Sequence, residues 1–156
     1  MIVVRFVLFL TLCFALVGYH FLTLANPRFE SLGMDGTVYF FTRDDVRSDL
    51  VKSRTQIATG FIYRADVGNA SLLRKKFTHI DGESIVINGY VDVSIILRQF
   101  GHRVVRTQYT AQTRIYYAFS GSFRSFITSG GDRINLQIAK RAGRTTIGWP
   151  VILGSY

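Results

Sequence analysis

The sequence predicts an α+β domain in which an antiparallel sheet carries one short amphipathic helix on a face, preceded by a transmembrane or signal helix. Three observations support this class. Residues 6–25 contain no Asp, Glu, Lys or Arg, the later apolar residues fall mostly in short runs typical of strands, and one segment has helical spacing. The length of 156 residues suits one domain, and the single cysteine excludes a disulfide framework.

The N-terminal apolar stretch is about as long as a helix that crosses a bilayer. Positive charge at the amino terminus and Arg5 predicts a cytoplasmic N-terminus, with the domain outside a single-pass plasma-membrane anchor. The alternative is a signal peptide cleaved after Ala25, which would release a secreted protein. We therefore expect a membrane segment over residues 1–25, a tether over 26–36 and one extracytoplasmic domain over 37–156.

The first part of the domain is expected to be strands separated by loops. Residues 37–41 form an almost wholly apolar run, which predicts a strand covered on both faces, and the charged residues 43–54 predict a surface loop. Apolar side chains of one parity between 57 and 63 predict another strand. Residues 72–80 and 85–87 predict two more, joined by a hairpin turn at Asp81 and Gly82.

One segment has the features of a soluble helix. Apolar residues at 93, 96, 97 and 100 share one face, Asp92 is placed to cap the first turn, and Gly101 is placed to end the last. Four further strands are predicted over 104–109, 114–120, 133–140 and 144–149, with Ala142 and Gly143 as a hairpin turn. Residues 129–132 predict a turn before a strand, whereas a phosphate-binding loop would open a helix.

The C-terminal blocks resemble the YwmB-like proteins of Firmicutes. The resemblance is carried by IYYAFS at 115–120, INLQIA at 134–139, IGWPVI at 147–152 and GSY at 154–156. Trp149 stands where that family usually has a small hydroxyl residue. The resemblance implies a secreted or membrane-tethered α+β domain with a TATA-box-binding-protein-like fold. It implies no catalytic residue, and its DNA-binding label reflects fold likeness, which does not decide function.

Candidate catalytic groups are few. His79, Asp81 and Glu83 would share one face of a continuous strand and include groups that bind metals, which keeps a metal-dependent or hydrolytic enzyme as an alternative. A turn at residues 81 and 82 would break that arrangement. His102 follows the end of the predicted helix, where a protonated imidazole would interact favourably with the helix dipole. We therefore expect a protein without cofactor or metal, and no residue is assigned to catalysis.

The net charge of +9 is unevenly distributed along the chain. Residues 26–97 carry nine basic and nine acidic side chains, whereas residues 98–156 carry nine basic and one acidic, a net charge of +8. Arginine dominates the C-terminal set and binds phosphate and carboxylate in a forked geometry. The candidate anion or partner contacts are Lys140, Arg141, Arg144, Arg124 and Arg133, the first three expected to form one patch around a turn.

A second candidate surface is the loop that contains Phe123, Phe126 and Ile127, which would insert into a membrane or contact a partner. The expected function is a non-enzymatic, membrane-tethered interaction domain that contacts anionic lipid, wall polymer or an acidic protein. A nucleic-acid partner is not expected, because an exported domain would not meet the chromosome, although the fold label keeps nucleic-acid binding as a second alternative.

Overall fold

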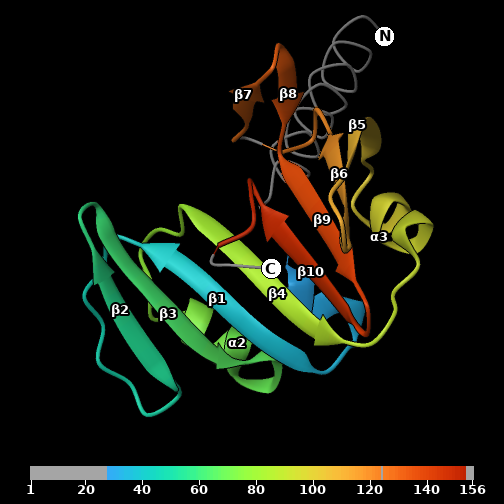
Figure 1. The fold of residues 1–156 in the computed structure, drawn as a ribbon. Coiled ribbons are helices and arrows are strands. Elements are labelled where there is room, and N and C mark those ends of the chain that lie inside the picture. The colour runs from blue at the N-terminus through green and yellow to red at the C-terminus, as the bar shows by residue number, and fades with distance from the viewer. Residues whose placement is uncertain (1–27, 124, 154–156) are drawn as a thin grey trace, which may run out of the picture.

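A computed structural model describes residues 28–123 and 125–153 (Figure 1). It contains one antiparallel eight-stranded sheet, two short α-helices and a 3-10 helix, so the predicted α+β class is confirmed. The helices are η1 (Phe29–Leu32), α2 (Val67–Arg74) and α3 (Val93–Gln99). The strands are β1 (Gly36–Thr42), β2 (Ser53–Ile57), β3 (Gly60–Asp66), β4 (Gly82–Asn88), β5 (Arg103–Tyr109), β6 (Thr113–Phe119), β7 (Ile127–Ser129), β8 (Asp132–Ile134), β9 (Leu136–Arg141) and β10 (Arg144–Trp149).

The strands of the large sheet lie in the order β2-β3-β1-β4-β10-β9-β6-β5, so the C-terminal hairpin β9–β10 pairs with β4 at the centre. Strands β7 and β8 form a separate two-stranded hairpin that projects beyond the sheet (Figure 1). We call the side of the sheet that packs on α2 and α3 the helix face, and the opposite side the tail face. Residues 150–153 lie on the tail face, where the backbone N–H groups of Ile152 and Leu153 donate to Gln137 and Ser84.

Strand β1 lies where the sequence predicts it but is covered differently. Val38, Phe40 and Thr42 are fully buried on the helix face, whereas Tyr39 and Phe41 are only half-buried on the tail face. The alternation is that of a sheet with one well-packed side. The expected cover is therefore complete on the helix face and only partial on the tail face.

Two predicted strands differ from the structure. The strand predicted over residues 57–63 is largely present, because Ile57 ends β2 and residues 60–63 belong to β3, but a turn at residues 58 and 59 interrupts it. The sequence predicts a strand over residues 72–80, but α2 occupies the first part, with Ala70 and Leu73 buried three positions apart on one helical face. The predicted hairpin turn at Asp81 and Gly82 is also absent, because Gly82 instead opens β4 after an irregular connection from α2.

Helix α3 matches its sequence signals. The Asp92 carboxylate accepts a hydrogen bond of 2.8 Å from the Ser94 N–H, and Gly101 ends the helix with a φ of +63°. Ile96 is fully buried in the core beneath the helix. A side-chain cap at the start and a left-handed glycine at the end satisfy backbone groups that the short helix cannot pair internally.

The predicted strand over residues 133–140 is divided in two by Asn135. The fully buried Asn135 amide donates to the Ser120 carbonyl and accepts from the Ser120 N–H, so it pairs with backbone as another peptide group would. The chain before it pairs as β8 with β7, and the chain after it pairs as β9 with β6 and β10. The expected turn at residues 129–132 joins β7 to β8.

The N-terminal part of the described chain packs on the domain. Phe29 is fully buried and makes an edge contact with Phe100 at 5.7 Å between ring centroids, while Gln99 donates to Ser31. Residues 29–32 therefore belong to the folded unit, although the sequence predicts a tether over 26–36. The predicted membrane segment, residues 1–25, lies outside the described residues, and within residues 28–123 and 125–153 no helix is sufficiently long and apolar to span a membrane.

Candidate functional site

The β9–β10 hairpin divides the predicted basic patch between the two faces of the sheet. Arg141 and Arg144 are direct cross-strand partners, so both exposed side chains lie on the tail face. Lys140 pairs with Thr145 and lies on the helix face. The expectation that these three cations form one patch is wrong, because adjacent residues of a strand point to opposite sides of the sheet.

Lys140 has a different cationic neighbour. Its register partner on β6 is Arg114, whose own partner on β5 is Tyr109, so these three side chains follow one another across three strands on the helix face. The Lys140 Nζ atom lies 3.0 Å from the centroid of the Tyr90 ring, and the Arg114 guanidinium lies 4.9 Å from that of Tyr109. We call these four residues the tyrosine–cation row.

Sequence reasoning missed three of the four residues in this row. Tyr90 lies between β4 and α3, Tyr109 at the end of an edge strand and Arg114 near the start of β6. Counting residues outward from the turn at 142 and 143 would have separated Lys140 from Arg141 and Arg144. The pairing of β9 with β6 cannot be counted in this way, because it depends on which strands become neighbours.

The β7–β8 hairpin carries the other predicted contacts. The Arg133 guanidinium lies 4.9 Å from the centroid of the Phe126 ring, and both Phe126 and Ile127 are exposed. Phe123 instead folds back, with its ring 4.6 Å from that of His102 and packed against the core. Among the described residues of this loop and hairpin, the large apolar side chains that remain exposed are Phe126 and Ile127, and Arg124 lies outside the described residues.

A β-bulge places two further arginines on one face. The register shifts between Val104 and Arg106, so Arg103 and Arg106 pair with Phe119 and Tyr117, which lie two positions apart on β6. Arg106 then reaches the β7–β8 hairpin, where it donates to Ser129 and lies 3.9 Å from the Asp132 carboxylate. The opposite parity of residues 103 and 106 in the sequence does not separate them, because the bulge adds a residue.

The cations of the C-terminal half have few acidic neighbours. Of the eight basic residues described between 98 and 153, only Arg106 lies within 4.0 Å of a carboxylate. In the N-terminal half, by comparison, four basic residues have such partners: Arg43, Lys52, Arg54 and Arg74. The charge asymmetry of the sequence is thus retained on the folded surface, where ion pairs could have neutralised it.

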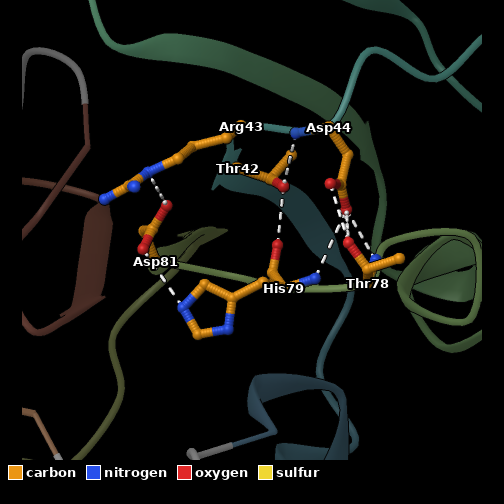
Figure 2. Close-up of polar contacts among 6 residues, drawn as sticks. All are labelled: Thr42, Arg43, Asp44, Thr78, His79 and Asp81. Atoms are coloured by element: carbon orange, nitrogen blue, oxygen red, sulfur yellow. Dashed lines mark hydrogen bonds and ion pairs between the residues drawn. The ribbon is translucent and has the colours of Figure 1, made fainter.

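The proposed metal triad is not assembled. His79 and Asp81 do meet, with the His79 Nε2 atom 3.2 Å from the Asp81 carboxylate, and the Arg43 Nε atom approaches that carboxylate at 3.5 Å (Figure 2). Glu83, however, is engaged in the core with Arg74. Within the described residues, no three His, Cys, Asp or Glu side chains are arranged to hold a metal ion.

The segment around His79 is held by the end of β1. The Thr42 hydroxyl donates to the His79 carbonyl at 2.6 Å, and the Asp44 carboxylate accepts from the N–H groups of Thr78 and His79 and from the Thr78 hydroxyl (Figure 2). These hydrogen bonds, the side-chain bond from Thr78 first, lower the pKa of Asp44. The two polar anchors therefore fix a connection that has no regular secondary structure.

A shallow pocket of about 500 Å³ lies beside this segment, lined by Phe41, Arg43, Thr59 and Asp81. The imidazole of His79 is exposed, and its partner Asp81 also lies 3.5 Å from the Arg43 guanidinium, so the Asp81 carboxylate is shared between two side chains. A His–Asp pair can orient an imidazole for proton transfer, but a nucleophile or substrate contact is also required. Among the described residues, the His79 imidazole has no hydrogen bond to a hydroxyl or thiol that could act as that nucleophile.

Glu83 anchors the N-terminal segment to the sheet. Its fully buried carboxylate lies 2.7 Å from Arg74 and accepts a hydrogen bond of 3.4 Å from the Phe29 N–H, while Arg74 also bonds Glu30 at 2.8 Å. Burial raises the pKa of Glu83 to about 7, although the nearby Arg74 guanidinium opposes this rise. This network joins η1, α2 and β4, which is a structural role.

His102 is neutral in the folded protein, contrary to the expectation from its place after α3. Burial lowers its pKa to about 4, and its ring nitrogens lie 2.9 Å from the Phe100 carbonyl and 3.0 Å from the Asn135 side-chain oxygen. The imidazole is thus a packed core group beside Phe123. A protonated histidine that interacts with the helix dipole is therefore not part of this structure at pH 7.

No family model matches the chain, and neither a curated protein nor a solved structure matches it.

Proposed function

We propose that the protein is a non-enzymatic, membrane-tethered interaction domain whose arginine-rich C-terminal half contacts anionic material outside the plasma membrane. The proposal includes membership of the YwmB-like proteins, anchorage by residues 1–25 and an envelope location. The material is anionic lipid, wall polymer or an acidic protein. The observation that carries the proposal is the exposed cationic surface, in which seven of the eight described C-terminal cations lack a nearby carboxylate.

Uncompensated charge is a physical reason for association with polyanions. Exposed cations attract anionic surfaces over roughly the Debye length, about 10 Å at 0.1 M salt, and added salt weakens this attraction. Seven of these cations form no ion pair with a carboxylate of the described residues, and even an exposed ion pair adds at most about 1 kcal/mol to stability, so ion pairing within the fold does not account for them. Contact with an anionic ligand accounts better for these unpaired charges than a contribution to stability does.

The test uses the full chain in nanodiscs of uncharged lipid, titrated with anionic vesicles and with an anionic wall polymer at low and high salt. Replacing Arg133, Lys140, Arg141 and Arg144 by Ala should weaken binding at least tenfold and reduce its salt dependence. The matched control replaces Arg47, Arg64, Lys75 and Lys76, four exposed cations of the N-terminal half without ion-pair partners in the described structure. Equal binding by the two variants, or binding that salt does not change, would contradict the proposal.

One specific observation in the described structure supports the enzyme alternative, namely the contact between His79 and Asp81 beside the pocket. The form of it that uses Glu83 as a third metal ligand is overturned, because Arg74 holds that carboxylate in the core. Nucleic-acid binding, the second alternative, shares the cationic surface with our proposal. It differs in the compartment that the domain must occupy.

A further inference from the structure

The tyrosine–cation row combines features that a purely electrostatic surface does not need. Tyr90 is 84% exposed and Tyr109 is 67% exposed, and each ring is contacted by a cation of the row. A large aromatic side chain in water contributes little to stability, so two of them beside the same pair of cations need a reason. The arrangement points to a ligand that has both charge and an apolar face.

The order of the four residues is set by the sheet. Lys140 and Arg114 are direct partners on adjacent strands, Tyr109 follows on the edge strand β5, and Tyr90 lies against Lys140 at the other end. Neighbouring strands lie about 4.8 Å apart, so the two cations are close enough to contact one phosphate group. The row therefore places two cations in the middle and one exposed aromatic ring at each end.

Several contacts hold these side chains in place. The Arg114 guanidinium donates to the Tyr116 hydroxyl at 3.3 Å while it lies over the Tyr109 ring. Lys140 lies over the Tyr90 ring. Cation–aromatic contacts of this kind restrain both partners, which reduces the ordering cost when a ligand binds.

The Asp92 carboxylate, which interacts with Lys140, caps the adjacent helix α3. It accepts from the Ser94 N–H at the start of α3, and this bond is the largest cause of its lowered pKa, to which Lys140 makes a smaller contribution. Lys140 and Arg114 have no carboxylate within 4.0 Å among the described residues. The positive charge of the row is thus available to a ligand.

We propose that the tyrosine–cation row binds a phosphate-bearing glycan, with phosphate held between Lys140 and Arg114 and sugar rings stacked on Tyr90 and Tyr109. The inference rests on the proposed function and names the surface and the ligand class. The apolar C–H face of a sugar ring matches an exposed tyrosine, and phosphate matches the paired cations. A bare polyanion would use the cations alone. A nucleic acid would also use both features, but an extracytoplasmic domain does not normally meet nucleic acid.

The experiment measures binding of the full chain, in nanodiscs of uncharged lipid, to three probes of matched charge. These are a glycosylated polyol-phosphate polymer, inorganic polyphosphate and a single-stranded DNA oligonucleotide. Replacing Tyr90 and Tyr109 together by Ala should weaken binding of the glycan on the order of tenfold, because two stacking contacts are lost without a change of charge. Binding of polyphosphate should not change.

Two further variants separate the contributions. Replacing Tyr90 and Tyr109 by Phe keeps both rings and should retain glycan binding. Replacing Arg114 and Lys140 by Ala should weaken binding of both the glycan and polyphosphate more than the same loss of charge at Arg141 and Arg144, which lie on the other face. All these side chains lie outside the buried core, and thermal unfolding of each variant checks that the fold is retained.

The outcomes distinguish this inference from the proposed function. If the wild-type protein binds none of the anionic probes, the proposed function fails and the inference fails with it. If wild type binds the glycan but the Tyr-to-Ala variant binds it equally well, only the row is overturned. Tighter binding of DNA than of the glycan, lost with the two tyrosines, would identify the row as a nucleic-acid site instead.

Discussion

At the scale of single residues, Glu83 is an ionisable side chain whose burial affects stability. Its carboxylate is 1% exposed, and burial is the main reason that its pKa rises to about 7. Because the ordinary pKa of a glutamate side chain is 4.5, the folded protein binds a proton more tightly than the unfolded chain does. The corresponding stability is fully present below the unfolded pKa and is lost as the pH rises through about 7.

Replacing Glu83 by Gln removes this titration. The free energy of unfolding of the variant relative to wild type should therefore rise between about pH 5 and about pH 8.5, by about 2–3 kcal/mol for a shift of this size. Urea unfolding at both pH values measures the difference. His102 titrates in both proteins, so its pKa of about 4 does not affect the comparison.

The control for this prediction is Glu30→Gln. Glu30 contacts the same Arg74 guanidinium but lies nearer to solvent, with 20% of its side chain exposed. Because the Glu30 charge also raises the pKa of Glu83, this variant should keep the titration of Glu83 but with a smaller rise in its pKa, and hence a weaker pH dependence than wild type. If Glu83→Gln and wild type differ by the same free energy at both pH values, the proton linkage is contradicted, although the ion pair would remain.

At the scale of elements, strand β10 is shaped by close contact with the tail of residues 150–153. A Cβ atom at Gly148 would lie within 3 Å of the backbone of Ile152, so no larger residue fits while the tail stays on the sheet. The tail in turn covers Ile115 and Ala139 through Ile152. The absence of a side chain at Gly148 is therefore a packing requirement of the tail face.

Gly148→Ala should lower the free energy of unfolding by about 1–3 kcal/mol, because the added methyl group forces the tail from the sheet. Gly68→Ala provides the matched control, since Gly68 lies in α2, where an added methyl group would meet nothing within 4 Å. That substitution should stabilise the protein by roughly 0.5–1 kcal/mol through the helix propensity of alanine. Urea denaturation of both variants checks the pair, and similar effects of the same sign would refute the packing argument.

At the scale of the whole molecule, charge is divided between the two ends of the sheet. The N-terminal strands carry most of the ion pairs, whereas the C-terminal strands carry cations with few partners. Strands β4 and β10 join the two parts through continuous pairing, so they form one sheet. In the proposed topology this whole sheet lies on the same side of the membrane.

The proposed topology predicts which ends of the chain a membrane-impermeant maleimide reaches on intact cells. In a Cys13→Ser background, a cysteine replacing the exposed Ser71 should be labelled without lysis, because the domain is expected outside the membrane. A cysteine replacing Ile2 should be labelled only after lysis. Labelling of Ser71→Cys that requires lysis would place the domain in the cytoplasm and favour the nucleic-acid alternative.

The sequence alone determined the elements whose signals are local. Helix α3 has its cap, apolar face and terminating glycine within about ten residues, and the strands β5, β6 and β10 are short runs with their own turns. The charge asymmetry is likewise a property of the chain. Local signals predict structure when backbone hydrogen bonds and turn preferences are satisfied by neighbours in the sequence.

Tertiary structure decided the features that depend on distant partners. Residues 72–80 have strand-like apolar residues, but burial of Ala70 and Leu73 against β1 and β3 favours the helix α2. Asn135 divides a predicted strand because it pairs with Ser120, and a bulge in β5 brings Arg103 and Arg106 to one face. The tyrosine–cation row exists because β9 pairs with β6, and strand order is set by the free energy of the whole sheet.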